Sequence, residues 1–202
     1  MKYPVRVLHV FARMDRGGAE TMIMNLYRNI DRSKIQFDFV VHTEKNCAFD
    51  DEILKMGGKI FRIPRYNGKN HYQYLKAWRD FFNKNKDYKI IHGHLNSSAS
   101  IYLKIAKKYG LTTIAHSHSS SSGNGISALI KNILQYPIRY TADYLFACSY
   151  LAGEWLYGSR ACKNKNFILL KNAIDTKLFA YNEVIRDRKR NELKVQDKFV
   201  IG

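Results

Sequence analysis

The sequence contains no long apolar run. A membrane-spanning helix needs about 20 mostly apolar residues in a row, and no segment of the 202 residues reaches that length. The apolar segment from Val5 to Phe11 is interrupted by charge and is too short for a secretion signal. Only three cysteines are present, at widely separated positions: Cys47, Cys148 and Cys162. Their number and spacing exclude a secreted disulfide framework and a zinc finger. These absences predict a cytoplasmic protein whose thiols are structural.

Acidic residues are also scarce. Seventeen aspartates and glutamates face 34 lysines and arginines, which gives a formal net charge of +17. Such a surplus attracts polyanions: nucleic acid, nucleotide phosphates or an anionic membrane face. No recognised nucleic-acid motif is present, so we expect no nucleic-acid partner. Tyrosines beside basic residues (Tyr66, Tyr72 and Tyr74 near Arg65 and Lys69) keep a basic nucleic-acid-binding module as an alternative. A solvated surface explains any one basic cluster equally well.

Strand-like and helix-like segments alternate regularly in this chain, of which 46% is apolar. Seven short runs rich in Val, Ile, Phe and Tyr have the composition of strands, namely 5–11, 37–42, 59–63, 89–94, 112–116, 144–148 and 166–170. Apolar residues have helical spacing at 20–29, 73–85, 97–109, 126–140 and 151–157. This alternation predicts an α/β, Rossmann-like, mostly parallel sheet of about seven strands with helices on both faces. Ligands then belong at the carboxyl ends of the strands.

The end of the chain differs in composition from the rest. We expect residues 1–180 to form one N-terminal Rossmann-like domain. The strongly charged segment 181–198 is expected to be a linker that is largely helical. Residues 199–202 then have the composition of the truncated first strand of a further, C-terminal domain. The alternative is an edge strand that completes the first domain.

A pair of glycines follows the first predicted strand, at the start of the first predicted helix. Gly17 and Gly18 allow a ligand to approach the backbone, and the free N–H groups of a helix start attract phosphate or hydroxyl groups. The spacing matches neither the dinucleotide fingerprint G-x-G-x-x-G nor a P-loop. This mismatch disfavours a nucleotide-binding oxidoreductase or epimerase, which is a further alternative. The segment predicts a substrate-binding loop that includes Gly17, Gly18 and Glu20, or else a plain tight turn.

Two histidine pairs end neighbouring predicted strands, in the sequences His92-Gly93-His94 and His116-Ser117-His118. Residues two apart on a strand face the same side, so each pair can line one rim of a cleft. Neutral imidazoles bind zinc, but neither motif contains an acidic ligand or a supporting partner, and we expect no metal. We expect His92 to be a half-buried strand residue whose ring bonds to the backbone.

The segment that follows His118 is rich in serine and glycine, and it is too polar for a core. We expect this loop to close over a polyhydroxylated substrate, with His94, Ser117 and Ser119 lining the binding site. Near the end of the seventh predicted strand, Asn172-Ala173-Ile174-Asp175 has the composition of an Asn/Asp turn.

Four spaced motifs cover nearly the whole chain: Arg-Gly-Gly-Ala-Glu, Ile-His-Gly-His, Ala-His-Ser-His and Asn-Ala-Ile-Asp-x-x-x-Phe. Together they resemble glycosyltransferase family 4, and most of all its bacterial enzymes that assemble exopolysaccharide or capsule repeat units. The resemblance implies a GT-B fold, in which two Rossmann-like domains face a cleft. In that fold the N-terminal domain mainly holds the acceptor and the C-terminal domain mainly holds the nucleotide sugar. It also implies a retaining transfer without a bound metal or cofactor, which agrees with the lack of an Asp-x-Asp sequence.

The same resemblance assigns roles to individual residues. Gly17 and Gly18 match the loop that approaches the donor diphosphate and the acceptor. His118 matches the histidine that reaches the transferred sugar. Asn172 matches the turn that leads to the interdomain linker, although Ala173 stands where the family often has glycine.

The partners follow from the resemblance as well. The donor is expected to be a nucleotide-diphosphate sugar, UDP-linked, and the acceptor a glycan or a polyprenyl-linked glycan. Peripheral contact with the anionic inner face of the membrane is expected from aromatic-basic stretches such as Leu134–Tyr140. The family's catalytic glutamates, spaced E-x(7)-E, would lie beyond Gly202. We therefore expect the isolated chain to be inactive.

Overall fold

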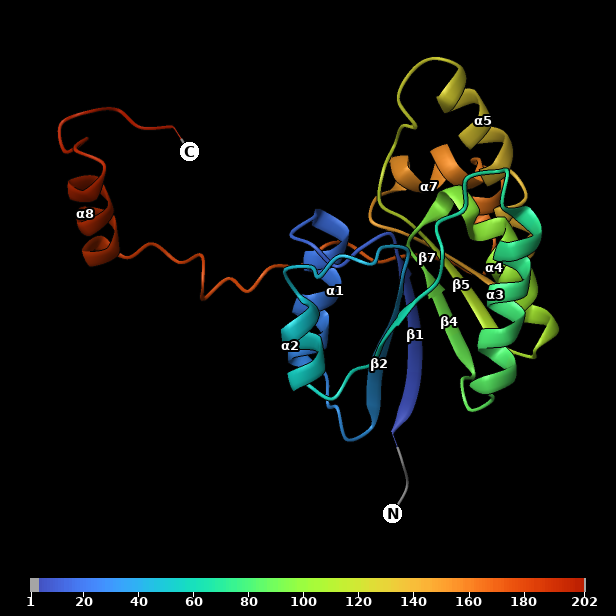
Figure 1. Cartoon of the computed structure of the whole chain (residues 1–202). Coiled ribbons are helices and arrows are strands. Elements are labelled where there is room, and N and C mark those ends of the chain that lie inside the picture. Colours follow the sequence, from blue (N-terminus) through green and yellow to red (C-terminus); the bar gives the residue numbers. More distant parts are fainter. Residues whose placement is uncertain (1–3, 202) are drawn as a thin grey trace. The chain divides into compact units, whose positions relative to one another are not determined.

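The computed structural model describes residues 4–201, and its centre is a sheet of seven strands (Figure 1). In chain order the strands are β1 (Val5–Phe11), β2 (Ile35–Val41), β3 (Ile60–Arg62), β4 (Ile90–Gly93), β5 (Thr112–Ser117), β6 (Tyr144–Ala147) and β7 (Phe167–Leu169). All pairings are parallel, and the strand order is β3-β2-β1-β4-β5-β6-β7. The predicted fold class is confirmed.

Helices connect the strands on both faces of the sheet. They are α1 (Gly18–Asn29), α2 (Asp50–Lys55), α3 (His71–Lys84), α4 (Ala99–Lys108), α5 (Ile126–Gln135), α6 (Ile138–Thr141) and α7 (Tyr150–Tyr157). Figure 1 shows α1 and α2 on one face and α3 and α4 on the other. This division follows from right-handed crossovers, because the chain proceeds from β1 to β3 in one direction and from β4 to β7 in the other. The switch point of the sheet therefore lies between β1 and β4.

The predicted helix over 126–140 is divided in the structure. α5 ends at Gln135, Pro137 precedes α6, and α6 ends at Thr141. Proline lacks the N–H that a continuous helix needs at this position, and its ring clashes with the preceding turn. The aromatic-basic stretch 134–140 is therefore a helix junction and not a single amphipathic face.

Two hydrophobic cores cover the two faces of the sheet. The larger one packs strand residues such as Val10 and Ile91 against the aromatic rings of α3 and α4, including Trp78 and Tyr102. The other packs Phe39 and its neighbours against α1 and α2. Side chains alternate between the two cores along β1 and β2, as expected for strands that are buried on both faces.

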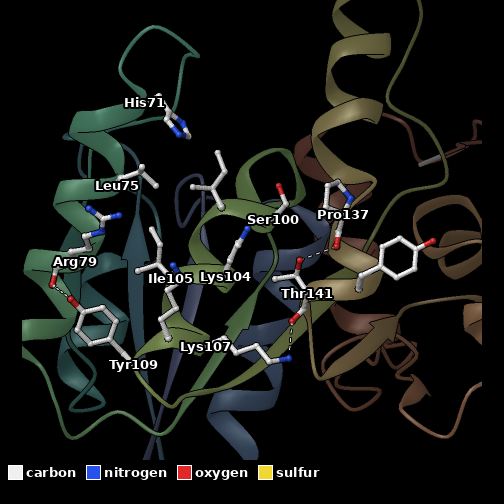
Figure 2. Close-up of a pocket in the computed structure, with 13 residues that line it drawn as sticks. His71, Leu75, Arg79, Ser100, Lys104, Ile105, Lys107, Tyr109, Pro137 and Thr141 are labelled. Atoms are coloured by element: carbon white, nitrogen blue, oxygen red, sulfur yellow. Dashed lines mark hydrogen bonds between the residues drawn. The ribbon is translucent and has the colours of Figure 1, made fainter.

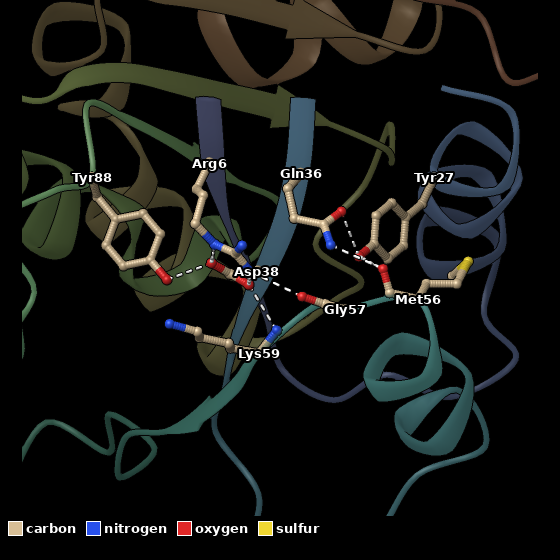
Figure 3. A network of polar contacts seen from close by, with 8 residues as sticks. All are labelled: Arg6, Tyr27, Gln36, Asp38, Met56, Gly57, Lys59 and Tyr88. Carbon is tan, nitrogen blue, oxygen red and sulfur yellow. Dashed lines mark hydrogen bonds and ion pairs between the residues drawn. The ribbon is translucent and has the colours of Figure 1, made fainter. Parts of the chain in front are cut away.

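A buried carboxylate fastens the amino ends of these strands together (Figure 3). Asp38 of β2 has no exposed surface. Arg6 Nε and Nη2 donate to its two oxygens at 2.5 Å each. Tyr88 Oη donates at 2.6 Å and the Lys59 backbone N–H at 2.7 Å. The hydrogen bond with Asp38 raises the pKa of Arg6 above its ordinary value. All of these donors would lose their acceptor if the carboxylate were removed.

We expect Asp38→Ala to lower the free energy of unfolding by about 3–5 kcal/mol, because breaking a buried pair leaves an uncompensated charge. In a chain of this size the melting temperature should fall by roughly 10 °C. Chemical denaturation followed by circular dichroism measures the free energy of unfolding, and thermal denaturation measures the melting temperature. Asp80→Ala is the control, since Asp80 pairs with Lys76 at the surface and exposed pairs contribute at most about 1 kcal/mol. Equal losses of unfolding free energy in the two variants would contradict the stabilising role of the buried Asp38 carboxylate.

The chain separates into two compact units, of which the first ends at Asn172 and the second begins at Ala173. In the second unit the Lys177 N–H donates to Asp175 Oδ1 at 2.9 Å, which is the predicted Asn/Asp turn. Asn182 then caps α8 (Glu183–Glu192), which lies inside the predicted linker 181–198. Residues 199–201 are not in a strand, since a strand forms only where a neighbour accepts and donates its ladder bonds. Gly202 lies outside the described residues, and the division into domains remains a prediction.

Candidate functional site

Loops at the carboxyl edge of the sheet carry most of the predicted site residues. Gly17 lies between β1 and α1, His94 follows β4 and His118 follows β5. β1 and β4 pair directly although they are far apart in the sequence. In an open parallel sheet, loops that diverge from such a switch point leave a crevice between them, where ligands bind.

The glycine loop leaves space at the start of α1. Gly17 precedes the helix with an extended backbone, at φ −90°, and neither glycine has a positive φ. A side chain added at Gly18 would meet no atom within 4 Å, so a ligand has room beside the free N–H groups. The Glu20 side chain folds back over Gly17. Partial burial raises the pKa of Glu20, and its carboxyl group can accept a hydrogen bond from a hydroxyl.

Five histidine rings lie together on β1, β4, β5 and the loops that follow β4 and β5. His9 of β1 is opposite His92 of β4 in the strand register, and His116 of β5 stacks on His92 with ring centroids 5.2 Å apart. His94 and His118 extend the cluster beyond the strand ends. The sequence interpretation missed His9, which is a single histidine within a strand. Only the pairing of β1 with β4 brings it to the others.

His94 joins two of these rings through hydrogen bonds. Its Nε2 lies 3.1 Å from His9 Nδ1, and its Nδ1 lies 2.8 Å from His118 Nε2. A neutral imidazole has one N–H donor and one acceptor nitrogen, so the three rings donate in a single direction along the chain His9–His94–His118. His118 Nδ1 is buried without a partner. A sugar can therefore reach a nitrogen of His118 only after the ring or its loop moves.

Burial keeps the cluster neutral. Desolvation lowers the pKa of His9 to about 3 and the pKa of His118 to about 4. For the same reason, and with a smaller effect from neighbouring histidines, the pKa values of His92, His94 and His116 lie well below the usual value. At pH 7 all five rings are uncharged, so each can accept as well as donate.

Two histidine triplets have the spacing of metal ligands, and the absence of a metal stays a prediction. Two triplets of ring nitrogens lie within 4.8 Å of one another, and His94 belongs to both. Zinc needs free lone pairs that converge on one point, whereas His94, which belongs to both triplets, uses its two ring nitrogens in hydrogen bonds to His9 and His118. Neither triplet includes a carboxylate. We assign hydrogen bonding and stacking to this cluster.

Three further residues of the histidine motifs and the loop after them differ in how far solvent reaches their side chains. His92 is buried and its Nε2 has no hydrogen-bond partner, so the expected half-buried ring with a backbone bond is not what the structure contains. Ser117 is fully buried, and its hydroxyl donates to the carbonyl oxygen of Ala152 at 2.7 Å. Ser119 is exposed and donates to the Ser121 carbonyl oxygen. Of the serines predicted for the site, Ser119 is the accessible one.

Asn172 lies further from the histidines. It is exposed and follows β7, and β6 separates β7 from β5, the strand that precedes His118. Strands are spaced by about 4.8 Å, so the carboxyl ends of β5 and β7 lie roughly 10 Å apart. The role of Asn172 in the site stays a prediction.

A cavity of about 680 Å³ opens at the same edge of the sheet. The loops after β1, β2, β3 and β4 line it together with α5. Its polar lining includes Arg13, His42, Arg65, Ser98 and Lys131. None of these was singled out as a site residue from the sequence. The position of His42 at the end of a predicted strand was the available signal.

The sequence pattern of Glycosyltransferase Family 4 matches residues 16–178. This range contains every predicted site residue from Gly17 to Asn172. The chain belongs to glycosyltransferase family 4. Membership in this family accounts for the glycine loop and the histidine motifs together, which neither an oxidoreductase nor a nucleic-acid-binding module would explain.

One relative matches the chain over almost its full length and another over less than half of it, and the chain covers only part of each. EpsF of Bacillus subtilis (strain 168), named as a glycosyltransferase, is 35% identical over an alignment of 202 positions that covers 98% of this chain and 53% of EpsF. The capsular polysaccharide biosynthesis glycosyltransferase CapH of Staphylococcus aureus is 28% identical over 91 residues, which are 45% of this chain and 24% of CapH.

A solved structure shares the fold. HepE of Anabaena, crystallised with UDP and glucose, superposes with a TM-score of 0.73 at 13% identity over 96% of this chain and 52% of HepE. The chain thus spans about half the length of EpsF and of HepE. Its parallel sheet with helices on both faces matches the Rossmann-like fold found in GT-B glycosyltransferases.

Proposed function

We propose that this chain is the acceptor-binding part of a retaining glycosyltransferase. The enzyme transfers a sugar from a UDP-linked nucleotide-diphosphate sugar to a glycan or a polyprenyl-linked glycan during extracellular polysaccharide synthesis. The family match over residues 16–178 carries the proposal, because it contains both the glycine loop and the histidine motifs. The UDP and glucose bound to HepE support the donor class, and the name of CapH supports the pathway class.

The acceptor is proposed to occupy the cavity at the carboxyl edge of the sheet. Arg65 and Lys131 line it and form no ion pair within residues 4–201. A polyprenyl-linked acceptor carries phosphate groups that these cations can bind, and its sugar hydroxyls can bond to polar groups such as Ser98. No metal or cofactor is part of the proposal.

The donor requires groups that this chain does not supply by itself. Charge that develops on the departing diphosphate must be met by preorganised donors and cations, and the glycine loop provides only backbone N–H groups at the start of α1. We propose that the remaining groups belong to the part of the enzyme that matches the other half of EpsF and HepE. His118 and Glu20 then contact the transferred sugar or the acceptor from the side described here.

The test compares residues 1–202 with a longer protein in which they are continued to the full length of a family member. The longer protein should release UDP from a UDP-sugar in the presence of acceptor. The isolated chain should be at least roughly 1,000-fold slower, since removing even one such donor costs 10²–10³. A coupled assay for UDP measures both rates, and comparable turnover by the isolated chain would overturn the division of roles.

A pair of variants of the longer protein tests the acceptor cavity in the same assay. Arg65→Ala should raise the KM for acceptor while donor hydrolysis stays unchanged. Lys69→Ala is the matched control, because Lys69 is an exposed cation close in sequence that does not line the cavity. An unchanged acceptor KM in Arg65→Ala would remove the acceptor from this cavity.

An enzyme whose acceptor is carried by lipid has to work beside a membrane. Within residues 4–201, no helix is long and apolar enough to cross one. We propose a cytoplasmic location with peripheral contact at the inner face of the membrane.

A further inference from the structure

Helix α5 has its apolar face turned to solvent. Ile126, Leu129, Ile130 and Ile133 follow the i, i+3, i+4, i+7 spacing of one helix face. Their exposed fractions are 79%, 60%, 52% and 64%. The buried residues of the same helix are Ala128 and Gln135, a small and a polar side chain. This distribution is the reverse of a helix that packs on a core, so the apolar face of α5 is a surface that needs a partner.

A basic groove lies beside this helix, between α3, α4 and α6 (Figure 2). It has a volume of about 700 Å³, and its cations are Arg79, Lys104, Lys107 and Lys108. No acidic side chain lines it. Lys107 is neutralised by Asp143 at 2.6 Å, whereas the other three cations have no ion pair in the part of the chain that is described. The groove therefore carries uncompensated positive charge over an apolar floor that includes Ile101 and Ile105.

The apolar face and the groove belong to one continuous surface. Ser100 at the start of α4 donates to the carbonyl oxygen of Leu134 in α5 at 2.8 Å. Pro137 and Tyr140, which directly follow α5, line the groove. Tyr136 and Tyr140 are 54% and 72% exposed at the junction. Tyrosines of this kind, apolar in body and polar at the tip, are enriched where proteins meet the lipid headgroup layer.

We propose that the apolar face of α5 and the basic groove together form a docking surface for an anionic lipid bilayer. The isoleucine and leucine side chains enter the boundary between headgroups and acyl chains, and Arg79, Lys104 and Lys108 bind lipid phosphates. Exposed aliphatic side chains beside unpaired cations on a chain of net charge +17 match this partner. A purely polar polyanion would leave the aliphatic face without a role.

The surface also has a consequence for the proposed acceptor site. α5 begins directly after the loop that runs from His118 to Gly125, and Ile130 and Lys131 of α5 line the proposed acceptor cavity. Docking through α5 would place this cavity next to the lipid surface, where a polyprenyl-linked acceptor is held. This consequence rests on the proposed function, whereas the lipid contact itself does not.

The experiment is co-sedimentation of the chain with vesicles of phosphatidylglycerol mixed with phosphatidylcholine, and with vesicles of phosphatidylcholine alone. The unmodified chain should bind the anionic vesicles preferentially. Leu129→Ser combined with Ile133→Ser should lower the partition coefficient at least about tenfold, at low and at high salt, because the lost contribution is apolar. The matched control combines Leu26→Ser with Leu54→Ser, two exposed leucines on α1 and α2.

A second pair of variants tests the charges. Lys104→Glu combined with Lys108→Glu should weaken binding mainly at low salt, because salt screens exposed charges. Lys45→Glu combined with Lys55→Glu changes the net charge equally on exposed residues away from the groove and should have a much smaller effect. Equal losses in the paired variants would show that only net charge acts, and would overturn the docking surface.

Two further outcomes would also overturn it. One is no binding to anionic vesicles at low salt. The other is a dimer of the lipid-free chain, seen by light scattering, that Leu129→Ser with Ile133→Ser dissociates, since the face would then belong to a second copy. Sugar transfer by the longer protein is measured separately with a water-soluble acceptor. If the unmodified chain does not bind anionic vesicles but the longer protein transfers sugar, the docking surface alone is rejected. If the unmodified chain binds the vesicles but the longer protein transfers no sugar, the proposed function alone is rejected.

Discussion

Acidification from pH 7 to about pH 4.5 should unfold the first unit cooperatively. Its histidine cluster remains neutral in the native state, because desolvation lowers the pKa of His9 to about 3 and of His118 to about 4 and holds the pKa values of His92, His94 and His116 well below the usual value. An unfolded histidine binds a proton near pH 6.5. Below that pH the unfolded state therefore binds more protons than the native state, and stability decreases as the pH falls.

The size of this effect follows from the number of histidines. Each histidine that stays neutral in the native state lowers the free energy of unfolding by about 1.4 kcal/mol for every pH unit below its pKa in the unfolded state. Five of them acting together remove several kcal/mol over the first pH unit, against a total stability of about 5–15 kcal/mol for a folded domain. We expect the transition between roughly pH 6 and pH 4, before His118 and His9 become protonated in the native state and the pH dependence weakens.

Circular dichroism during acid titration, combined with urea unfolding at several pH values, measures this dependence. His92→Phe removes one titrating ring and keeps an aromatic side chain between His9 and His116, so the slope should decrease by about 1.4 kcal/mol per pH unit. Phe39→Leu, which alters packing against His9 without removing a histidine, should leave the slope unchanged. A native state that keeps its full stability down to pH 4 would contradict the neutral cluster.

His118→Ala should lower kcat about 100-fold or more in the longer enzyme, the magnitude of losing one hydrogen bond to the transition state. His92→Ala should change kcat only a few-fold. The buried position of His92 instead predicts a cavity and a loss of about 3 kcal/mol in the free energy of unfolding. The two histidines therefore differ in which property they control.

Measuring kcat, the KM values and the melting temperature for each variant separates the two roles. His118→Ala should keep most of the native melting temperature, since its ring is only partly buried and has one hydrogen-bond partner, His94. The interpretation fails if both variants lose turnover equally when compared at a temperature where both are folded. The buried Nδ1 of His118 adds a further expectation, which is that the loop from His118 to Gly125 changes its hydrogen-exchange protection when donor and acceptor bind.

The succession of elements was predictable because it depends on local spacing. A period of two residues marks strands and a period near 3.6 marks helices, and their alternation implies parallel crossovers. The glycine pair before α1 and the histidine pairs after β4 and β5 were recognisable for the same reason, since each is a short motif at a predictable strand end. Pro137 could have predicted the break between α5 and α6 from its missing N–H alone.

Contacts between distant segments required the tertiary structure. His9 joins the cluster only because β1 pairs with β4 across the switch point, and periodicity does not specify which strands are neighbours. The cavity needs four loops and α5 in one place. The apolar face of α5 has the spacing of an ordinary core-facing helix, and only the folded chain shows that it faces solvent.

The sequence by itself therefore determined the elements, the family motifs and the strand ends that carry them. Tertiary structure decided which residues meet and which surfaces remain open, because contacts between segments depend on strand order and packing and not on local spacing.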